Sequence, residues 1–298
     1  MRRAPIDKND EVVRLALRSI LFVPGTRVDR FPKAVASGAD AVVLDLEDGV
    51  DSARKTEARQ LVAEWVTSTP REGSARFVRI NGVRSAWFAD DLAWLPEVAG
   101  HIDAVVLPKA ESPGDLERIT ARAPRRRVIP LLETARGILA ATAIAAAADA
   151  DIPALLFGAE DLTAELGIPR TLAGDEILLA RSQVVLAAAT IGADAIDAVF
   201  VDFTSPDRLR EDALRARALG FGGKMAIHPD QVSVINAVFS PSAEEVAAAQ
   251  RLIEADKAAH SRGEGVYRVD DRMVDAPIVA RARRVLAVAD AISRARGR

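Results

Sequence analysis

The chain has 298 residues, of which 49% are hydrophobic, and its net charge is −3. This length and apolar content suffice for one large α/β barrel or for two smaller domains. The nearly balanced charge argues against a nucleic acid as the main partner, and the lack of cysteine excludes disulfides, zinc–thiolate sites and thiol nucleophiles.

The N-terminal segment has no apolar core of the kind that a signal peptide needs. Its first ten residues read MRRAPIDKND, and no run in the chain reaches the roughly 18 apolar residues of a membrane span. We therefore expect a cytoplasmic protein with no membrane partner, in which the first 16 or so residues are loosely held.

Short apolar runs of strand length alternate with longer stretches of helical composition. Eight strands are predicted, at Ser19–Val23, Ala41–Leu46, Ala75–Asn81, Ala104–Leu107, Val128–Leu132, Ala154–Phe157, Ala195–Phe200 and Gly223–Ile227. Helices are predicted between them at Arg27–Ser37, Ala53–Val66, Trp87–Leu95, Pro113–Ala121, Ile138–Ala148, Asp175–Ile191 and Pro206–Leu219. Continuously apolar strands indicate a parallel sheet covered by helices, and eight strands are enough to close it.

We therefore predict an α/β fold, a (β/α)₈ TIM barrel over residues 1–240, with a doubly wound open sheet as the alternative. Two further helices are predicted at Ala243–Ala259 and Ile278–Arg296. Residues 241–298 are then a C-terminal helical extension, which serves as a lid or contributes to a neighbouring subunit.

Polar side chains follow most of the predicted strands. In a barrel of this kind they gather at the mouth formed by the C-terminal strand ends, where active sites lie. The residues placed there are Asp45, Glu47, Asp48, Arg79, Asn81, Lys109, Glu133, Asp161, Asp202 and His228. Such an acid-rich mouth is typical of a metal-dependent enzyme that acts on anionic substrates.

Glu133 and Asp161 follow two successive strands of one βαβ unit, so their carboxylates are expected to face the same mouth. Two carboxylates without nearby cysteine or histidine favour a hard cation, and Mg²⁺ is the usual occupant. The alternative is structural, because an acid in the first turn of a helix complements the helix dipole.

Several of these mouth residues have competing interpretations. Arg79 either binds a carboxylate or oxyanion of the substrate or forms a structural ion pair with Asp48. Of Asp45, Glu47 and Asp48, one or two are expected to hold metal-bound water, and the rest to act as scaffold. Lys109 suggests a rival mechanism, a Schiff base with a keto substrate. His228, which precedes a proline, is interpreted as a residue that fixes its loop.

Eight motifs in order along the chain resemble one known family. They are LFVPGTR, LDLEDGV, VRIN, LPKAE, LETARG, FGAEDL, AIHPDQ and MVDAP, and they extend from Ser19 to about Val285. Together they resemble the citrate lyase β-subunit-like proteins, which include malyl-CoA and citramalyl-CoA lyases. The resemblance implies a TIM barrel with a C-terminal extension, a homotrimer or hexamer, bound Mg²⁺ (or Mn²⁺) and coenzyme A as part of the substrate.

The resemblance also implies roles for individual residues. Glu133 and Asp161 match the metal ligands, and Arg79 matches the arginine that contacts substrate oxygens. Asp275, in MVDAP, matches a catalytic aspartate that the tail delivers into the mouth of a neighbouring subunit, although its place before Pro277 equally suits an N-cap. Arg27 and Lys33 match positions that contact the phosphates of coenzyme A.

The implied activity is that of a Mg²⁺-dependent acyl-CoA lyase. It cleaves or forms a C–C bond in a malyl-CoA-type 3-hydroxyacyl-CoA, giving glyoxylate or pyruvate and acetyl-CoA or a homologue. The alternatives are a malyl-CoA thioesterase or malate synthase-like reaction, a Schiff-base aldolase that uses Lys109, and a citrate lyase β-subunit that acts on an acyl-carrier partner.

Overall fold

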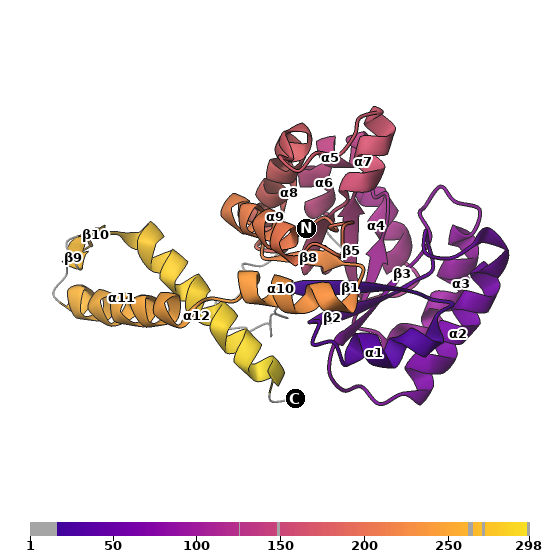
Figure 1. Cartoon of the computed structure of the whole chain (residues 1–298), viewed down its shortest axis with the longest axis horizontal. Helices are drawn as coiled ribbons and strands as arrows, with labels where there is room; N and C mark the ends of the chain where they lie inside the picture. The colour runs from indigo at the N-terminus through magenta and orange to yellow at the C-terminus, as the bar shows by residue number, and fades with distance from the viewer. Residues whose placement is uncertain (1–16, 125, 148–149, 262–264, 270–271, 297–298) are drawn as a thin grey trace. The chain divides into compact units, whose positions relative to one another are not determined.

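The computed structural model describes residues 17–124, 126–147, 150–261, 265–269 and 272–296, so the predicted loose N-terminus lies outside the described residues. The chain divides into two compact units, one formed by Leu17–Phe239 and the other containing Ser240–Arg298. Each is described by itself (Figure 1). No helix of the described residues is long and apolar enough to cross a membrane.

The first unit is a closed barrel of eight parallel strands. Each strand pairs with the next along the chain, and β1 pairs with β8 through Ser19–Lys224 to Leu21–Ala226. The strands are β1 (Ser19–Pro24), β2 (Ala41–Asp45), β3 (Ala75–Arg79), β4 (Ala104–Leu107), β5 (Arg127–Leu132), β6 (Ala154–Phe157), β7 (Asp194–Asp197) and β8 (Gly223–Ala226). The predicted barrel is confirmed, and the open sheet is excluded.

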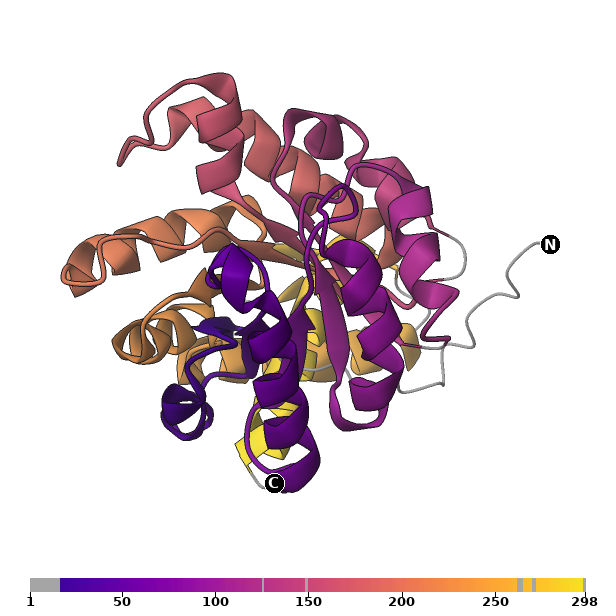
Figure 2. The ribbon, with the colours of Figure 1, turned by 90° about the vertical axis from the view of Figure 1, so that its right-hand side faces the viewer.

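Helices surround the barrel strands (Figure 2). They are α1 (Phe31–Val35), α2 (Lys55–Ser68), α3 (Phe88–Val98), α4 (Pro113–Thr120), α5 (Ala135–Leu139), α6 (Ala141–Ala145), α7 (Ala159–Leu166), α8 (Leu178–Ile191), α9 (Pro206–Leu219) and α10 (Pro229–Phe239). Side-chain caps fix several starts: Asp115 accepts the N–H groups of Glu111 and Ser112, and Thr134 accepts that of Gly137.

The strands are apolar because their side chains are buried on both faces of the sheet. Every residue of β2, β4, β6 and β8 is buried. Side chains such as Phe77, Phe157 and Ile20 are completely enclosed and are among the largest in the core. This rigid core fixes the positions of the strand ends, and hence of the side chains that follow them.

Buried ion pairs join the two last strands to the helices outside them. Arg181 of α8 binds Asp197 of β7 at 2.7 Å and Asp212 of α9 at 3.0 Å, and Lys224 of β8 reaches both acids. Burial alone would raise the pKa of Asp212, but Lys224 and Arg181 outweigh it and lower the pKa to about 2. This network is structural and lies outside the mouth cavity.

Three parts of the predicted element pattern were wrong or incomplete. The single helix Ile138–Ala148 is instead two short helices, α5 and α6, and the first starts early because Thr134 caps it. The seventh strand was predicted to end at Phe200, but it ends at Asp197, because its pairing with β8 stops there. Helices α7 and α10 were not identified as separate elements.

The second unit contains two long helices, α11 (Ala243–Ser261) and α12 (Ala276–Arg296), and the antiparallel pair β9 (Tyr267–Val269) and β10 (Arg272–Val274). Buried Asp256 of α11 accepts hydrogen bonds from the Tyr267 hydroxyl at 3.0 Å and from Arg283 of α12 at 3.1 Å. These contacts tie the hairpin and α12 to α11.

Candidate active site

A cavity of about 340 Å³ lies at the C-terminal ends of the barrel strands. Its polar lining includes Asp45, Arg79, Glu133 and Asp161, so the structure brings together four side chains that the sequence placed at the mouth. The apolar part of the lining is formed by Phe22, Val23, Leu131, Val199, Met225 and Ile227. The cavity therefore offers a charged end and an apolar wall to a substrate.

Arg79 is held in a fixed position by two acids from β2 and the loop after it. Its Nε and Nη2 donate to the two carboxylate oxygens of Asp45 at 2.6 and 2.7 Å, and its Nη1 lies 2.8 Å from Glu47 Oε2. The suggested structural pair with Asp48 is thus replaced by Asp45, which points toward β3. Burial alone would lower the pKa of Arg79, but Asp45 and Glu47 outweigh it and raise the pKa.

The loop after β2 is shaped by the same aspartate. Asp45 accepts the backbone N–H groups of Glu47 and Gly49, each at 2.9 Å. Glu47 is therefore directed toward Arg79 and Lys109, and burial raises the pKa of its carboxyl group. Burial would also raise the pKa of Asp48, but Lys109 outweighs it and lowers that pKa.

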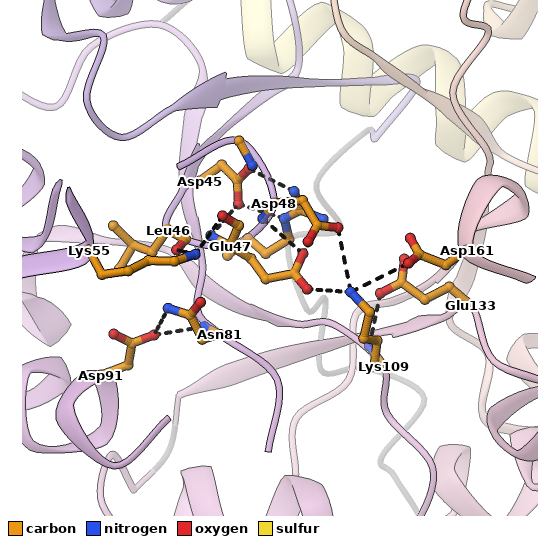
Figure 3. Close-up of polar contacts among 12 residues, drawn as sticks. Asp45, Leu46, Glu47, Asp48, Lys55, Asn81, Asp91, Lys109, Glu133 and Asp161 are labelled. Carbon is orange, nitrogen blue, oxygen red and sulfur yellow. Dashed lines mark hydrogen bonds and ion pairs between the residues drawn. The ribbon is translucent and has the colours of Figure 1, made fainter. Parts of the chain in front are cut away.

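Lys55 supports this loop from behind and was missed by the sequence reasoning. Its buried ammonium donates to the carbonyl oxygens of Leu46 at 2.8 Å and Glu47 at 2.7 Å, and lies 5.1 Å from the centre of the Trp87 ring. Burial lowers the pKa of Lys55. A lysine in the first turn of a helix gave no signal of this role, because the partner atoms are backbone carbonyls (Figure 3).

Glu133 is the most enclosed acid of the cavity, at 2% exposed. A Cβ added to Gly158 on the neighbouring strand end would overlap the Cβ of Glu133 and lie 2.6 Å from its Oε2, so only glycine leaves room for this side chain. Its Oε1 accepts the backbone N–H of Lys109 at 2.9 Å. Burial, and then the charges of Asp161 and Glu47, raise the pKa of Glu133 well above its ordinary value.

Asp161 lies in the first turn of α7, and its partner differs from that of its neighbour Glu160. Glu160 is bound by Arg170 at 2.9 Å, whereas Asp161 lies 3.5 Å from the ammonium of Lys109. Asp161 thus lies in the first turn of α7, where an acid complements the helix dipole, and it also lines the cavity beside Glu133. The two interpretations of this acid are compatible.

Glu133 and Asp161 form an acidic pair that suits a hard cation. A buried carboxylate whose ionised form is opposed by two like charges is stabilised by a cation bound beside it. No set of three or more His, Asp or Glu side chains among the described residues is arranged to hold a metal. A cation here would therefore keep water or substrate oxygens as its other ligands, which is the usual situation for Mg²⁺.

Other predicted mouth residues have structural roles. Asn81 donates through its backbone and side chain to Asp91, both at 2.7 Å, and Asp202 accepts hydrogen bonds from Thr204 and Ser205. The His228 ring stacks on Phe203 at 5.2 Å, which agrees with a residue that fixes its loop.

Arg27 and Lys33, the residues matched to coenzyme A, are not among the residues that line the cavity. Arg27 binds Asp29 at 2.8 Å, Lys33 is exposed on α1, and Arg30 lines the cavity instead. Asp275, in the second unit, precedes α12, and its Oδ1 accepts the N–H of Ile278 at 3.3 Å. The N-cap interpretation of Asp275 is therefore seen, and its catalytic role stays a prediction.

The family model described as HpcH/HpaI aldolase/citrate lyase matches residues 18–229, which span the whole barrel. The chain belongs to the HpcH/HpaI aldolase/citrate lyase family. A citrate lyase subunit beta-like protein of Deinococcus radiodurans is 39% identical over 91% of this chain and 96% of its own length. A (3S)-malyl-CoA thioesterase of Cereibacter sphaeroides is 36% identical over 93% of this chain and 95% of its own length.

A solved member of the HpcH/HpaI aldolase/citrate lyase family has the same fold. The CitE protein of Mycobacterium tuberculosis, in complex with magnesium, acetoacetate and coenzyme A, superposes with a TM-score of 0.76 at 39% identity. The match covers 93% of this chain and 99% of that one. The predicted family and its class, the carbon–carbon lyases, are confirmed.

We expect that Arg79→Lys lowers kcat/KM by about 10²- to 10³-fold, because a lysine cannot bridge Asp45 and Glu47 while presenting donors to substrate. Steady-state kinetics would measure the loss. Arg84→Lys is the matched control, since Arg84 is exposed and bound to Glu111 at 2.8 Å. An Arg79→Lys enzyme within a few-fold of wild type would contradict the role given to the guanidinium.

Proposed function

We propose that this chain is a Mg²⁺-dependent acyl-CoA lyase that cleaves, or in reverse forms, a C–C bond in a 3-hydroxyacyl-CoA of the malyl-CoA type. The products are an α-keto acid, glyoxylate or pyruvate, and acetyl-CoA or a homologue. One observation carries the proposal: buried Glu133 lines a cavity together with Asp161 and the fixed guanidinium of Arg79.

Glu133 and Asp161 are the side chains proposed to hold the cation. When bound, Mg²⁺ (or Mn²⁺) supplies Lewis acidity to the hydroxyl and carboxylate oxygens of the substrate. The fit rests on the close approach of Gly158, which leaves space for the Glu133 side chain, and on the raised pKa of Glu133. Glu47 and Asp48 are proposed to orient water around this pair, and Lys109 holds them near it.

Arg79 is proposed to stabilise the negative charge that develops during C–C cleavage. Its position is set before substrate binds, because Asp45 engages it through two parallel hydrogen bonds. A prepositioned cation in a water-poor cavity stabilises a developing oxyanion more strongly than one that must reorganise. The apolar wall formed by Leu131, Val199 and Met225 limits water around it.

Asp275 is proposed to protonate the enolate carbon of the acyl-CoA product and to remove that proton in the reverse direction. In this proposal the segment that carries it reaches the mouth of a neighbouring subunit in a homotrimer. Arg27 and Lys33 are proposed to contact the phosphates of coenzyme A, and Arg30, which lines the cavity, is a further candidate.

The thioesterase outcome is the second candidate, and the Cereibacter sphaeroides relative favours it. The Schiff-base alternative is opposed by the charge on Lys109. Burial alone would lower the pKa of Lys109, but the ion pair with Glu47 outweighs it and raises the pKa. A protonated amine is not a nucleophile, so the carboxylates around Lys109 work against this mechanism.

Malyl-CoA, citramalyl-CoA and methylmalyl-CoA, assayed with Mg²⁺, should release an α-keto acid in step with a shorter acyl-CoA. EDTA should abolish the reaction, and added Mg²⁺ should restore it. Free coenzyme A formed without keto acid would select the thioesterase. Activity only on an acyl-carrier protein would select the subunit alternative, and borohydride trapping that survives EDTA would select the Schiff base.

A further inference from the structure

Lys109 has an unusual backbone for a residue with a side chain. Its φ is +50°, and it is the only non-glycine residue with positive φ among those that the structure describes. Residues held in this region persist where the surrounding contacts determine them, and they cluster at functional sites. Here the conformation directs the Lys109 N–H to Glu133 at 2.9 Å.

The same conformation sends the side chain of Lys109 into the middle of the acidic mouth. Its ammonium is bound to Glu47 and lies 3.5 Å from both Asp48 and Asp161 (Figure 3). These acids come from the loop after β2 and from the first turn of α7, on opposite sides of the ammonium (Figure 3). One residue therefore contacts both proposed metal ligands, Glu133 through its backbone and Asp161 through its side chain.

Two cations cannot share Asp161 without repelling each other, because both act on the same carboxylate at short range. The ammonium of Lys109 has other carboxylate partners available. Glu47 and Asp48 stay within its reach on the side away from Asp161, and the side chain of Lys109 is 35% exposed, which leaves it free to shift.

We propose that Lys109 is a built-in counter-cation that competes with the divalent cation for Asp161 and is displaced onto Glu47 and Asp48 when the metal binds. The inference rests on the metal site of the proposed function. Without metal, Lys109 offsets the repulsion among the carboxylates and keeps the mouth assembled. The same contact weakens metal binding, because it must be broken first.

Removing the positive charge of Lys109 should therefore tighten metal binding, because the ammonium no longer competes for Asp161. We expect Lys109→Met to bind Mg²⁺ about ten-fold or more tightly than wild type, because the loss of one competing ion pair changes the affinity by about that factor. Methionine keeps an unbranched side chain, one atom shorter than that of lysine, and the strain of a non-glycine residue at positive φ. Lys109→Gly removes that strain as well and should show the same gain, which separates the charge from the backbone.

Calorimetric titration of Mg²⁺ into the metal-stripped full-length chain measures the affinity directly, without activity. Lys109→Arg, which keeps the charge, should stay near wild type, and Lys257→Met, at an exposed lysine of α11, should be unchanged. Thermal unfolding in EDTA should show Lys109→Met less stable than wild type, with a larger stabilisation on adding Mg²⁺.

A folded Lys109→Met or Lys109→Gly chain that binds Mg²⁺ as weakly as wild type, or more weakly, would overturn the proposal. If the wild-type chain bound no Mg²⁺ at all, both this inference and the metal site of the proposed function would fail. The two failures are distinguishable, because only the second is visible in the wild-type titration.

Discussion

Glu133→Gln is expected to lower kcat by about 10³-fold or more and to abolish measurable Mg²⁺ binding, because it removes one of two charged ligands from a buried site. Glutamine keeps the shape and can still accept the Lys109 N–H, so the backbone contact at 2.9 Å survives. Calorimetry with Mg²⁺ and kinetics across metal concentrations would measure both effects.

Stability distinguishes this result from misfolding. The raised pKa of Glu133 means that its contribution to metal-free stability is fully present below its unfolded pKa and is lost as pH rises through the folded pKa. Glutamine cannot ionise and so avoids this loss, and Glu133→Gln in EDTA should therefore unfold at the same temperature as wild type or higher. Glu160→Gln, at an acid bound by Arg170, should keep Mg²⁺ affinity.

Asp275→Asn is expected to lower kcat by about 10²- to 10⁴-fold while changing the KM for acyl-CoA little, because it removes a general acid and base. Asparagine is as good an N-cap as aspartate, so α12 should still start at Ala276. Asp290→Asn, at an exposed position of the same helix, is the control. Turnover near wild type would show that Asp275 is a cap and nothing more.

Mixing two inactive variants tests whether Asp275 acts across subunits. Co-expressed Glu133→Gln and Asp275→Asn chains would form some sites with an intact barrel from one chain and an intact aspartate from its neighbour. Random mixing should restore about one quarter of wild-type activity. If both residues served the site of their own chain, the mixture would stay inactive.

The barrel was predictable because most of its strands are apolar runs of strand length. The limits of β4 and β6 agree with the prediction residue for residue, and α9 does as well. Asp197 shows where this reasoning fails. The apolar run continues to Phe200, but pairing with β8 ends at Asp197, and the composition of the run does not record where a partner strand stops.

The site was predictable where an acid or base lies at the C-terminal end of a strand or within a few residues of it. Glu133, Asp161 and Arg79 reach the cavity because the closed barrel points all its strand ends to one side. Their partners were harder to identify. Arg79 pairs with Asp45 rather than Asp48 because of the side-chain directions in one loop. The hydrogen bonds of Lys55 could not be predicted because their acceptors are backbone carbonyl oxygens, which every residue type carries.

Gly158 has a consequence for any attempt to redesign this enzyme. The glutamate at the end of one strand occupies the volume that a methyl group would need on the next, so the two positions form a single steric unit. Exchanging Glu133 for a shorter acid, in order to alter the metal preference of the proposed site, would leave a gap opposite Gly158. Enlarging position 158 would displace the glutamate. Libraries that vary these strands independently would therefore consist mostly of inactive combinations.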